Sequence, residues 1–393
     1  MSRKLKALGS GVAVASMLLL SACGSGGSPE TAPETPADTP AELSAEAQAA
    51  LEIVEAVSQP YDEFVAPGPA LDGLDSLGGK TVHYIVAQQG VPMFGIIADA
   101  LSEALGQFDI DVQVCDAKAS PEGAASCISQ ALDANAAAVI SGSLPEEMAQ
   151  TAFAQVREAG LPLVFTQVQP EDPTGQDDPS KVAYISPDNA EMQGWNANWV
   201  IADSDAKADV LVVKVTDTPA TIAWTDFGSL PTYENACAEC NVEVIEATTY
   251  QLDKVPSLIS AALTKNPNIG YIQSPFAIMD DSIKQGVQAA ARDDVKIVSG
   301  DSALAQLQDL ASGGLIKAVV GNSSPAFGWY VADETLRLLS GEESVQNHPF
   351  PFRRLLTEEI AKGLDLTPEG EANGSWYGEA DYQAGFKELW SVQ

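Results

Sequence analysis

The stretch TVHYIVAQQGVPMFGIIADALSEAL, residues 81–105, contains the pattern from which the fold is predicted. Its first seven residues are mostly apolar and β-branched, which is typical of a buried strand. Pro92 then begins a segment whose apolar residues recur at helical spacing: Phe94, Ile97, Ala98, Leu101 and Leu105. A buried strand followed directly by an amphipathic helix predicts one unit of a parallel α/β sheet.

The same alternation recurs along the chain to about residue 340. Further apolar runs predict strands at 111–115, 136–142, 161–168, 181–185, 209–215, 242–250, 269–274, 295–300 and 316–322. Strands that are apolar throughout indicate parallel sheets with helices on both faces. Because the series restarts near residue 181, we expect an α/β fold of two Rossmann-like lobes with parallel sheets, joined by a hinge of several crossings. The expected lobes are residues 80–188 with 322–346, and 189–321 with 347–393.

The N-terminal segment has the pattern of an export signal. Residues 1–22 combine a basic start with an apolar run that is shorter than the ~20 residues of a membrane-spanning helix. Leu20-Ser21-Ala22-Cys23 resembles the lipobox of bacterial lipoproteins, which makes Cys23 the predicted lipid anchor; an ordinary secretory signal is the alternative. Residues 23–43 then read as the lipidated cysteine and a disordered tether rich in Pro, and 44–79 as a helix and an irregular lead-in.

The charge balance excludes several kinds of partner. The chain has 55 acidic and 20 basic residues, a net charge of −35. Such a field repels nucleic acid and anionic headgroups alike. We therefore expect no nucleic-acid partner, and contact with a membrane only through the lipid anchor.

The remaining cysteines are even in number and predict disulfides in an oxidising compartment. Three pairings are possible, and local pairing of Cys115 with Cys127 and of Cys237 with Cys240 is expected. A redox centre is the alternative for Cys237-Ala-Glu-Cys240, but such a motif should follow a strand and open a helix. This one follows a helix-like segment and precedes a strand.

The chain is poor in the reactive groups of an enzyme. It has two histidines, His83 and His348, so neither a metal site nor a histidine base is expected, and no cofactor motif is present. Gly300-Asp301-Ser302 is similar to the opening block of one esterase family but stands late in the chain. The adjacent pair Asp280 and Asp281 is interpreted as negative charge at a helix N-terminus.

Polar groups instead follow the predicted strands, at the edge where open α/β sheets bind ligands. They are rich in amides and hydroxyls: Gln88-Gln89, Ser141-Gly142-Ser143, Thr166-Gln167, Thr216-Asp217, Gln273-Ser274 and Ser299-Gly300-Asp301. Such groups hydrogen-bond neutral polar molecules, and neighbouring aromatic rings supply stacking surfaces.

Residues 80–345 resemble the periplasmic sugar-binding proteins of ABC importers, the type I ribose- and galactose-binding class. The resemblance is carried by Val91-Pro92-Met93-Phe94 after the first strand, by AGLPLVF at 159–165, by Ile185-Ser-Pro-Asp-Asn189, by Ser299-Gly300-Asp301 and by Asn322. It implies a solute held between two lobes and delivered to permease subunits, without a cofactor. The candidate ligand-binding residues are Gln88, Met93, Phe94, Gln167, Asn189, Trp224, Ser274, Asp301 and Asn322.

Two departures from the family pattern concern the ligand. Gln167-Val168 stands where sugar binders usually have Asp-Arg, and Ser274-Pro275 where they usually have Asn-Asp. A sugar, a polyol, a nucleoside-like compound or a small amphipathic molecule therefore all remain open. Structural roles compete at some positions: core packing for Phe94, an anchor between the lobes for Trp224, and a helix N-cap for Asp301.

The sequence thus predicts a monomeric solute-binding protein of an ABC importer, tethered by lipid to the outer face of the cell membrane. It predicts no enzyme activity. A lipoprotein that presents its solute to a signalling receptor is the main alternative, and a secreted hydrolase is a weaker one.

Overall fold

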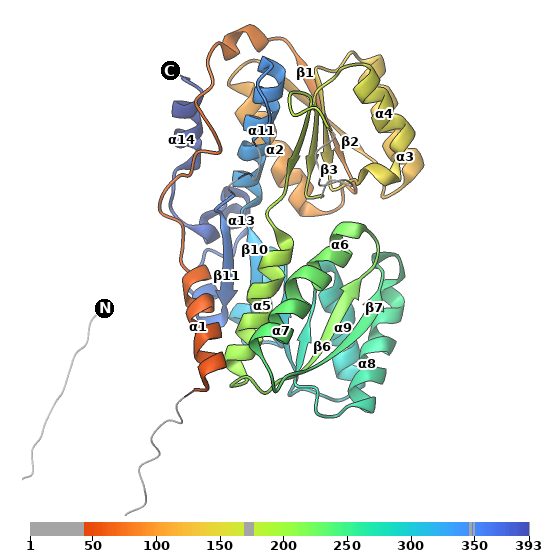
Figure 1. Cartoon of the computed structure of the whole chain (residues 1–393), viewed down its shortest axis with the longest axis vertical. Helices are drawn as coiled ribbons and strands as arrows, with labels where there is room; N and C mark the ends of the chain where they lie inside the picture. The colour runs from red at the N-terminus through yellow and green to blue at the C-terminus, as the bar shows by residue number, and fades with distance from the viewer. Residues whose placement is uncertain (1–42, 169–176, 346–347, 349, 393) are drawn as a thin grey trace, which may run out of the picture. The chain divides into compact units, whose positions relative to one another are not determined.

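The computed structural model describes residues 43–168, 177–345, 348 and 350–392, and Leu43–Gln393 cluster as one compact unit. The predictions for residues 1–42, namely the signal peptide, Cys23 and most of the tether, lie outside the described residues. Two sheets with flanking helices make up the compact unit (Figure 1). None of the described helices is long and apolar enough to cross a membrane.

The first sheet has the strand order β2-β1-β3-β4-β5, and all of its pairings are parallel. Its strands are β1 (Thr81–Val86), β2 (Asp111–Asp116), β3 (Ala138–Gly142), β4 (Leu163–Thr166) and β5 (Val182–Ile185). The helices that follow β1 to β3 are α2 (Pro92–Gly106), α3 (Pro121–Asp133) and α4 (Gln150–Glu158), the last after a 3₁₀ turn at Glu146–Met148. We call this sheet and its helices the first lobe.

The second sheet has the order β11-β10-β9-β8-β6-β7. Its strands are β6 (Asp209–Val215), β7 (Asn241–Ala247), β8 (Tyr271–Gln273), β9 (Lys296–Ser299), β10 (Ile316–Asn322) and β11 (Arg353–Thr357). The helices around it are α5 (Asn189–Asp203), α6 (Pro219–Ala223), α7 (Leu230–Ala236), α8 (Val255–Lys265), α9 (Ala277–Ala289) and α10 (Leu304–Ala311). We call this sheet and these helices the second lobe.

The expectation of a wholly parallel second sheet is wrong for β11, which pairs antiparallel with β10. Asn322, at the end of β10, lies opposite Arg353, at the start of β11. The chain leaves the sheet at Asn322 and re-enters it at the same end, so the returning strand must run in the opposite direction.

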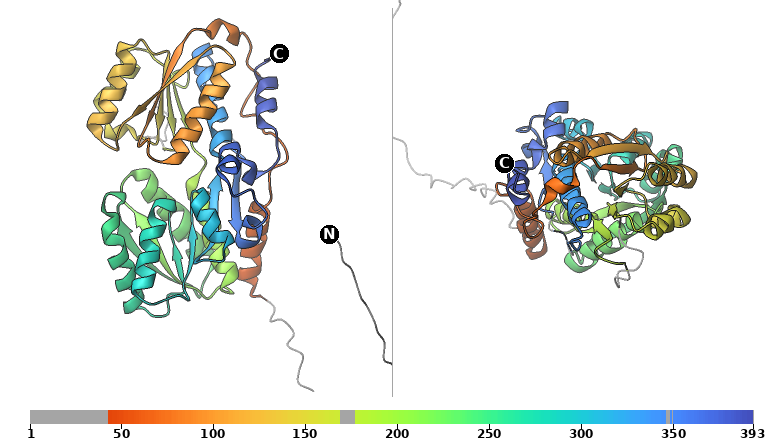
Figure 2. Two further views of the ribbon diagram at one scale, coloured as in Figure 1. Left: turned by 180° about the vertical axis from the view of Figure 1, so that it is seen from behind. Right: turned by 90° about the horizontal axis from the view of Figure 1, so that it is seen from above.

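Segments between the lobes cross in more than one place. The chain passes from β5 of the first sheet into α5, and from β10 of the second sheet into α11 (Ser324–Ser340), which packs against α2 of the first lobe. After α11 it returns to the second sheet as β11. These crossings lie side by side in the views of Figure 2.

The segments at the two ends of the described chain pack against the lobes and the crossings between them. Helix α1 (Ala45–Val57) packs against α5, and a 3₁₀ turn follows at Leu74–Leu77. After β11 come α12 (Glu358–Ala361), α13 (Pro368–Asn373), a 3₁₀ turn at Ser375–Tyr377 and α14 (Tyr382–Leu389). Although residues 347–393 were expected with the second lobe, α14 packs against α11, because Trp390 after it stacks on Trp329 with ring centroids 5.4 Å apart.

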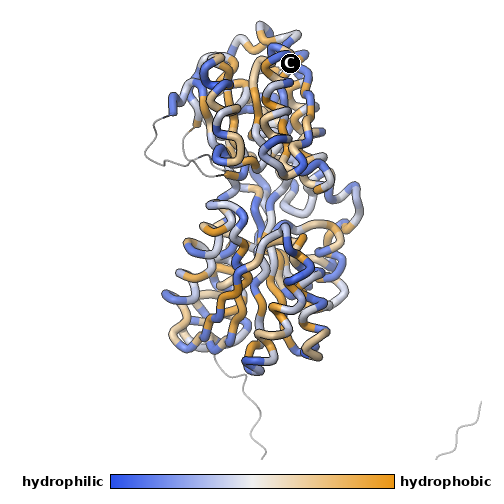
Figure 3. The backbone as a smooth tube through the Cα atoms, turned by 90° about the vertical axis from the view of Figure 1, so that its right-hand side faces the viewer, coloured by the Kyte–Doolittle hydropathy of each residue, from blue (hydrophilic) through white to orange (hydrophobic). Residues whose placement is uncertain are grey.

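The hydrophobic cores follow the apolar strand runs from which the fold was predicted. In β1, β3 and β4 almost every side chain is buried. Figure 3 shows hydrophobic segments running through both lobes. Burial on both faces is what an apolar strand between two helical layers requires.

Both expected disulfides form in the structure. Cys115 at the end of β2 pairs with Cys127 of α3, and Cys237 pairs with Cys240. The second pair closes the turn between α7 and β7. It therefore does not open a helix after a strand, as the redox motif would.

Candidate ligand-binding site

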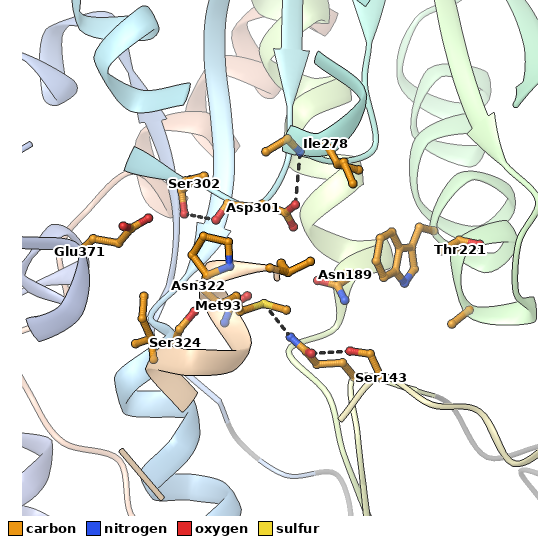
Figure 4. Close-up of a pocket in the computed structure, with 18 of the residues that line it drawn as sticks. Met93, Ser143, Asn189, Thr221, Ile278, Asp301, Ser302, Asn322, Ser324 and Glu371 are labelled. Atoms are coloured by element: carbon orange, nitrogen blue, oxygen red, sulfur yellow. Dashed lines mark hydrogen bonds between the residues drawn. The ribbon is translucent and has the colours of Figure 1, made fainter. Parts of the chain in front are cut away.

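A cavity of about 500 Å³ lies at the carboxyl ends of strands from both sheets. Six of the candidate ligand-binding residues line it: Met93, Gln167, Asn189, Trp224, Asp301 and Asn322. They come from the first lobe, from the second lobe and from two of the crossings between them (Figure 4). Residues more than 200 positions apart in the sequence therefore share one site.

Three other candidates do not line the cavity. Phe94 is 5% exposed and packs in the core under α2, whereas Met93, one residue earlier, faces the cavity. Gln88 is exposed outside the lining. Ser274 is fully buried, and its hydroxyl donates a hydrogen bond to Asp280 Oδ1 at 2.6 Å.

The first-lobe wall is built around Gln167. Its side-chain oxygen accepts a hydrogen bond from the Ser143 hydroxyl at 2.6 Å, and its amide nitrogen lies 3.3 Å from the Met93 sulfur (Figure 4). Gln167 has a positive φ of 60°, which turns the chain sharply at the end of β4. The Gln167 amide is thus held in place by contacts within its own lobe.

The second-lobe wall contains Asp301, on the turn after β9. One carboxylate oxygen accepts a hydrogen bond from the Ala277 backbone N–H, 3.2 Å away at the start of α9. Asp301 and Ser302 both have positive φ, so the turn aims the carboxylate across the strand ends. The side chain is open to the cavity but crowded by protein, and this burial raises the pKa of Asp301 to about 7.

Asp280 supports this turn from behind. Its carboxylate accepts hydrogen bonds from Ser274, Ser299 and Gln306, at 2.6 to 3.0 Å. Burial raises the pKa of Asp280 to about 6. The interpretation of Asp280 as simple helix N-terminal charge was therefore incomplete, because the side chain is buried and joins β8, β9 and α10; its neighbour Asp281 is exposed.

Trp224 covers the second lobe's side of the cavity. It stands at the start of a π-helical turn, Trp224–Ser229, that follows a Thr218–Thr221 capping box. Its ring meets Phe276 edge to face, with centroids 5.9 Å apart. This contact fixes the plane of the indole, so Trp224 can offer a fixed apolar surface to a ligand.

Two amides stand where the chain crosses between lobes. Asn189 is the first residue of α5, after the cap residue Asp188, and Asn322 is the last residue of β10. The crossings are also tied to each other, since Arg353 of β11 pairs with Glu191 of α5 at 2.5 Å. Both amides therefore line the cavity beside the crossings between the lobes.

Sequence reasoning missed one wall of the cavity, which the C-terminal segment 371–377 supplies. Glu371, Trp376 and Tyr377 line the cavity from this segment. The Tyr377 hydroxyl contacts the Ser302 hydroxyl, and Glu371 Oε1 accepts a hydrogen bond from the Leu304 N–H at 2.9 Å. No strand end marks this segment in the sequence; its only local signal is the Thr367-Pro368 cap that starts α13.

A possible metal-ligand cluster lies elsewhere. Asp333, Glu334 and His348 have ligand atoms within 4.8 Å of one another. Asp333, however, already accepts hydrogen bonds from Arg337 and from the Trp390 indole. A guanidinium this close disfavours a further cation, so we assign the cluster to packing between α11, the following segment and Trp390.

Comparison with known proteins agrees with this geometry. Residues 82–343 match the family model described as a periplasmic binding protein domain. A search of curated proteins gives no match.

Several solved structures share the fold at low sequence identity. A glucose-galactose binding protein from Geobacillus stearothermophilus has a TM-score of 0.62 at 15% identity, over 71% of this chain and 98% of its own. A 5-methylthioribose transporter solute binding protein from Thermotoga lettingae gives 0.64 at 14%, over 78% and 96%. An ABC transporter solute binding protein from Mycobacterium smegmatis, with bound glycerol, gives 0.61 at 16%, over 73% and 97%.

Proposed function

The chain belongs to the periplasmic binding protein domain family, and from that premise we propose that it is the solute-binding component of an ABC importer. The fold is the type I arrangement of two α/β lobes, and the family is one of extracytoplasmic solute-binding proteins, not an enzyme class. The protein captures a small solute between its lobes and delivers it to a permease.

The observation that carries the proposal is that residues of both lobes line the same cavity. Met93 and Gln167 come from the first lobe, Trp224 and Asp301 from the second, and Asn322 from a crossing. A ligand that contacts all of them favours the closed arrangement of the lobes over an open one, because only closure makes all the contacts at once. A permease can then recognise the closed form.

The solute is small and partly polar. The solved structures that share the fold include a glucose-galactose binding protein and proteins with bound 5-methylthioribose, myo-inositol and glycerol. A cavity of about 500 Å³ is of a size to hold a molecule of this class. Amides at Gln167, Asn189 and Asn322 can hydrogen-bond its hydroxyls.

We propose further that Cys23 is lipidated and that the acidic segment after it tethers the protein to the outer face of the membrane. A protein so anchored stays near its permease. Membrane fractionation of cells that express the chain and its Cys23→Ser variant tests this. Wild type is expected with the membranes and the variant in the medium; recovery of both in the medium would sink the anchor.

The uptake function is tested by binding and closure together. Purified protein is titrated calorimetrically with sugars, polyols and nucleosides, and small-angle scattering is recorded with and without each compound that binds. The expected result is a bound compound that makes the protein more compact. Failure of every compound that binds to compact the protein would contradict capture by closure.

A matched pair of aromatic variants locates the binding. Trp224→Ala should weaken binding at least tenfold, which corresponds to about 1.4 kcal/mol. Phe227→Ala, three residues on in the same turn, is the control, because Phe227 is 77% exposed and does not line the cavity. Equal losses in both variants would place the site elsewhere.

A further inference from the structure

The charged side chains among the described residues that line the cavity are both acidic. Among the described residues that line it, the charged ones are Asp301 and Glu371, and none is lysine, arginine or histidine. The two carboxylates come from separate elements, the turn after β9 and helix α13. Figure 4 shows them on either side of Ser302. No side chain among the described lining residues therefore offers a positive charge to an anionic solute.

Neither carboxylate has a cationic partner among the described residues. Each accepts one backbone hydrogen bond, Asp301 from Ala277 at 3.2 Å and Glu371 from Leu304 at 2.9 Å. One oxygen of each is thus held by the backbone, and the other has no protein donor in the described part of the chain. Crowding by the surrounding protein raises the pKa of Asp301 to about 7, and the nearby charge of Asp280 adds to the effect.

The rest of the lining suits the body of an organic cation. Trp224, Met93, Ile278 and Val168 present aromatic, thioether and aliphatic surface to the same space. Indole rings attract ammonium groups through their negatively polarised faces, and this attraction grows when water is excluded. The fixed plane of Trp224 provides such a face beside the acidic residues.

We propose that this cavity is selective for small organic cations, an ammonium or quaternary amine carried on a compact body with an apolar face. The inference rests on the proposed solute-binding function and adds the substrate class to it. The cation supplies the positive charge that Asp301 and Glu371 lack, while the amides at the crossings bind the polar remainder.

The test compares pairs of ligands that are similar in shape and differ in charge. Choline and its uncharged isostere 3,3-dimethylbutan-1-ol form one pair, and glucosamine and glucose form a second. Binding is measured by calorimetry and by the intrinsic tryptophan fluorescence of the full chain. In at least one pair the cation should bind at least tenfold more tightly than its neutral partner. Neutral partners that bind as well as the cations in both pairs would overturn the substrate class but leave the uptake function standing.

Variants that remove one carboxylate at a time test whether Asp301 and Glu371 cause the selectivity for cations. Asp301→Asn and Glu371→Gln should each reduce the affinity for the cation at least tenfold and leave the neutral partner within threefold. Asp281→Asn is the matched control, because Asp281 is exposed on α9 and does not line the cavity. Trp224→Ala should weaken both members of a pair. If no compound of either pair binds and scattering shows no compaction with any solute, the proposed function fails together with the inference.

The pH dependence provides a second readout. Choline keeps its charge at every pH, so any change in its affinity reports on the protein. Because Asp301 must lose its proton to bind a cation, the affinity for choline should rise about tenfold or more between pH 5.5 and 8. Asp301→Asn should flatten this profile. A profile in wild type that is flat, or that falls with pH, would contradict the assigned role of Asp301.

Discussion

The Ser299 hydroxyl donates a hydrogen bond to Asp280 at 2.8 Å, and this contact ties α9 to the strand end that carries Asp301. Gln306 of α10 donates to the same carboxylate at 2.7 Å and also to the Gly300 carbonyl at 2.8 Å. Asp280 therefore holds together three elements behind the cavity. The residue that faces the ligand and the residue that fixes its turn are 21 positions apart in sequence.

Removal of the Asp280 carboxylate should destabilise the protein strongly. Asp280→Ala leaves the hydroxyls of Ser274 and Ser299 and the Gln306 amide without their buried acceptor. We expect a loss of about 3 kcal/mol in the free energy of unfolding, measured by urea denaturation. Asp281→Ala, its exposed neighbour on the same helix, should cost less than about 0.5 kcal/mol. Similar losses for the two variants would show that the buried network contributes little.

The same carboxylate should give stability a characteristic pH dependence. Its pKa is raised from about 3.9 in the unfolded chain to about 6 in the fold. The folded state therefore holds the proton more tightly, and the contribution of this group is full below pH 4 and is lost as the pH rises through 6. Asp280→Asn cannot ionise. As the pH rises from 4 to above 6, wild type should therefore lose unfolding free energy relative to this variant. Parallel stability curves would contradict it.

The strands and helices of the parallel α/β units could be predicted from the sequence, because their patterns are local. Apolar strand runs and helical spacing were enough for the parallel units, because a strand buried on both faces has to be apolar throughout. Asp301 and Asn322 could be predicted as cavity residues because they stand at the ends of β9 and β10. Parallel strands bring their carboxyl ends to one edge of the sheet, where ligands bind.

What the sequence left undecided depends on contacts between distant residues. Phe94 and Met93 differ by one step round a helix, and only the packing of α2 decides which of them faces the cavity. Ser274 looked like a ligand contact because nothing local reveals that Asp280 captures its hydroxyl. The wall formed by 371–377 depends on the contact between Tyr377 and Ser302, 75 positions apart, which no periodicity encodes.

The buried ion pair of α11 offers a third test. Arg337 pairs with Asp333 at 2.7 Å, one helical turn apart, and both side chains are almost fully buried. Arg337→Met should cost about 3–5 kcal/mol, because it strands a buried carboxylate. Arg337→Met combined with Asp333→Leu should recover part of this loss, since no unpaired charge remains. Lys362→Met, which breaks the exposed pair with Glu358, should change stability by less than about 0.5 kcal/mol in the same urea titration. A double variant less stable than Arg337→Met would count against the charge explanation.

A side chain at Gly321 should disturb the contact between Ser302 and Tyr377 at the wall of the cavity and thereby weaken solute binding. A methyl group at this position of β10 would lie 2.0 Å from the Ser302 hydroxyl and 2.8 Å from that of Tyr377. Gly321→Ala must therefore displace the turn that carries Asp301, and we expect at least a tenfold loss of solute affinity, about 1.4 kcal/mol. Gly95→Ala is the control: its methyl group meets nothing within 4 Å, and alanine favours the helix by about 0.5–1 kcal/mol. Calorimetry with a bound solute, together with thermal unfolding of each variant, separates lost affinity from lost stability. Unchanged affinity in Gly321→Ala would show that the solute does not sense the position of this turn.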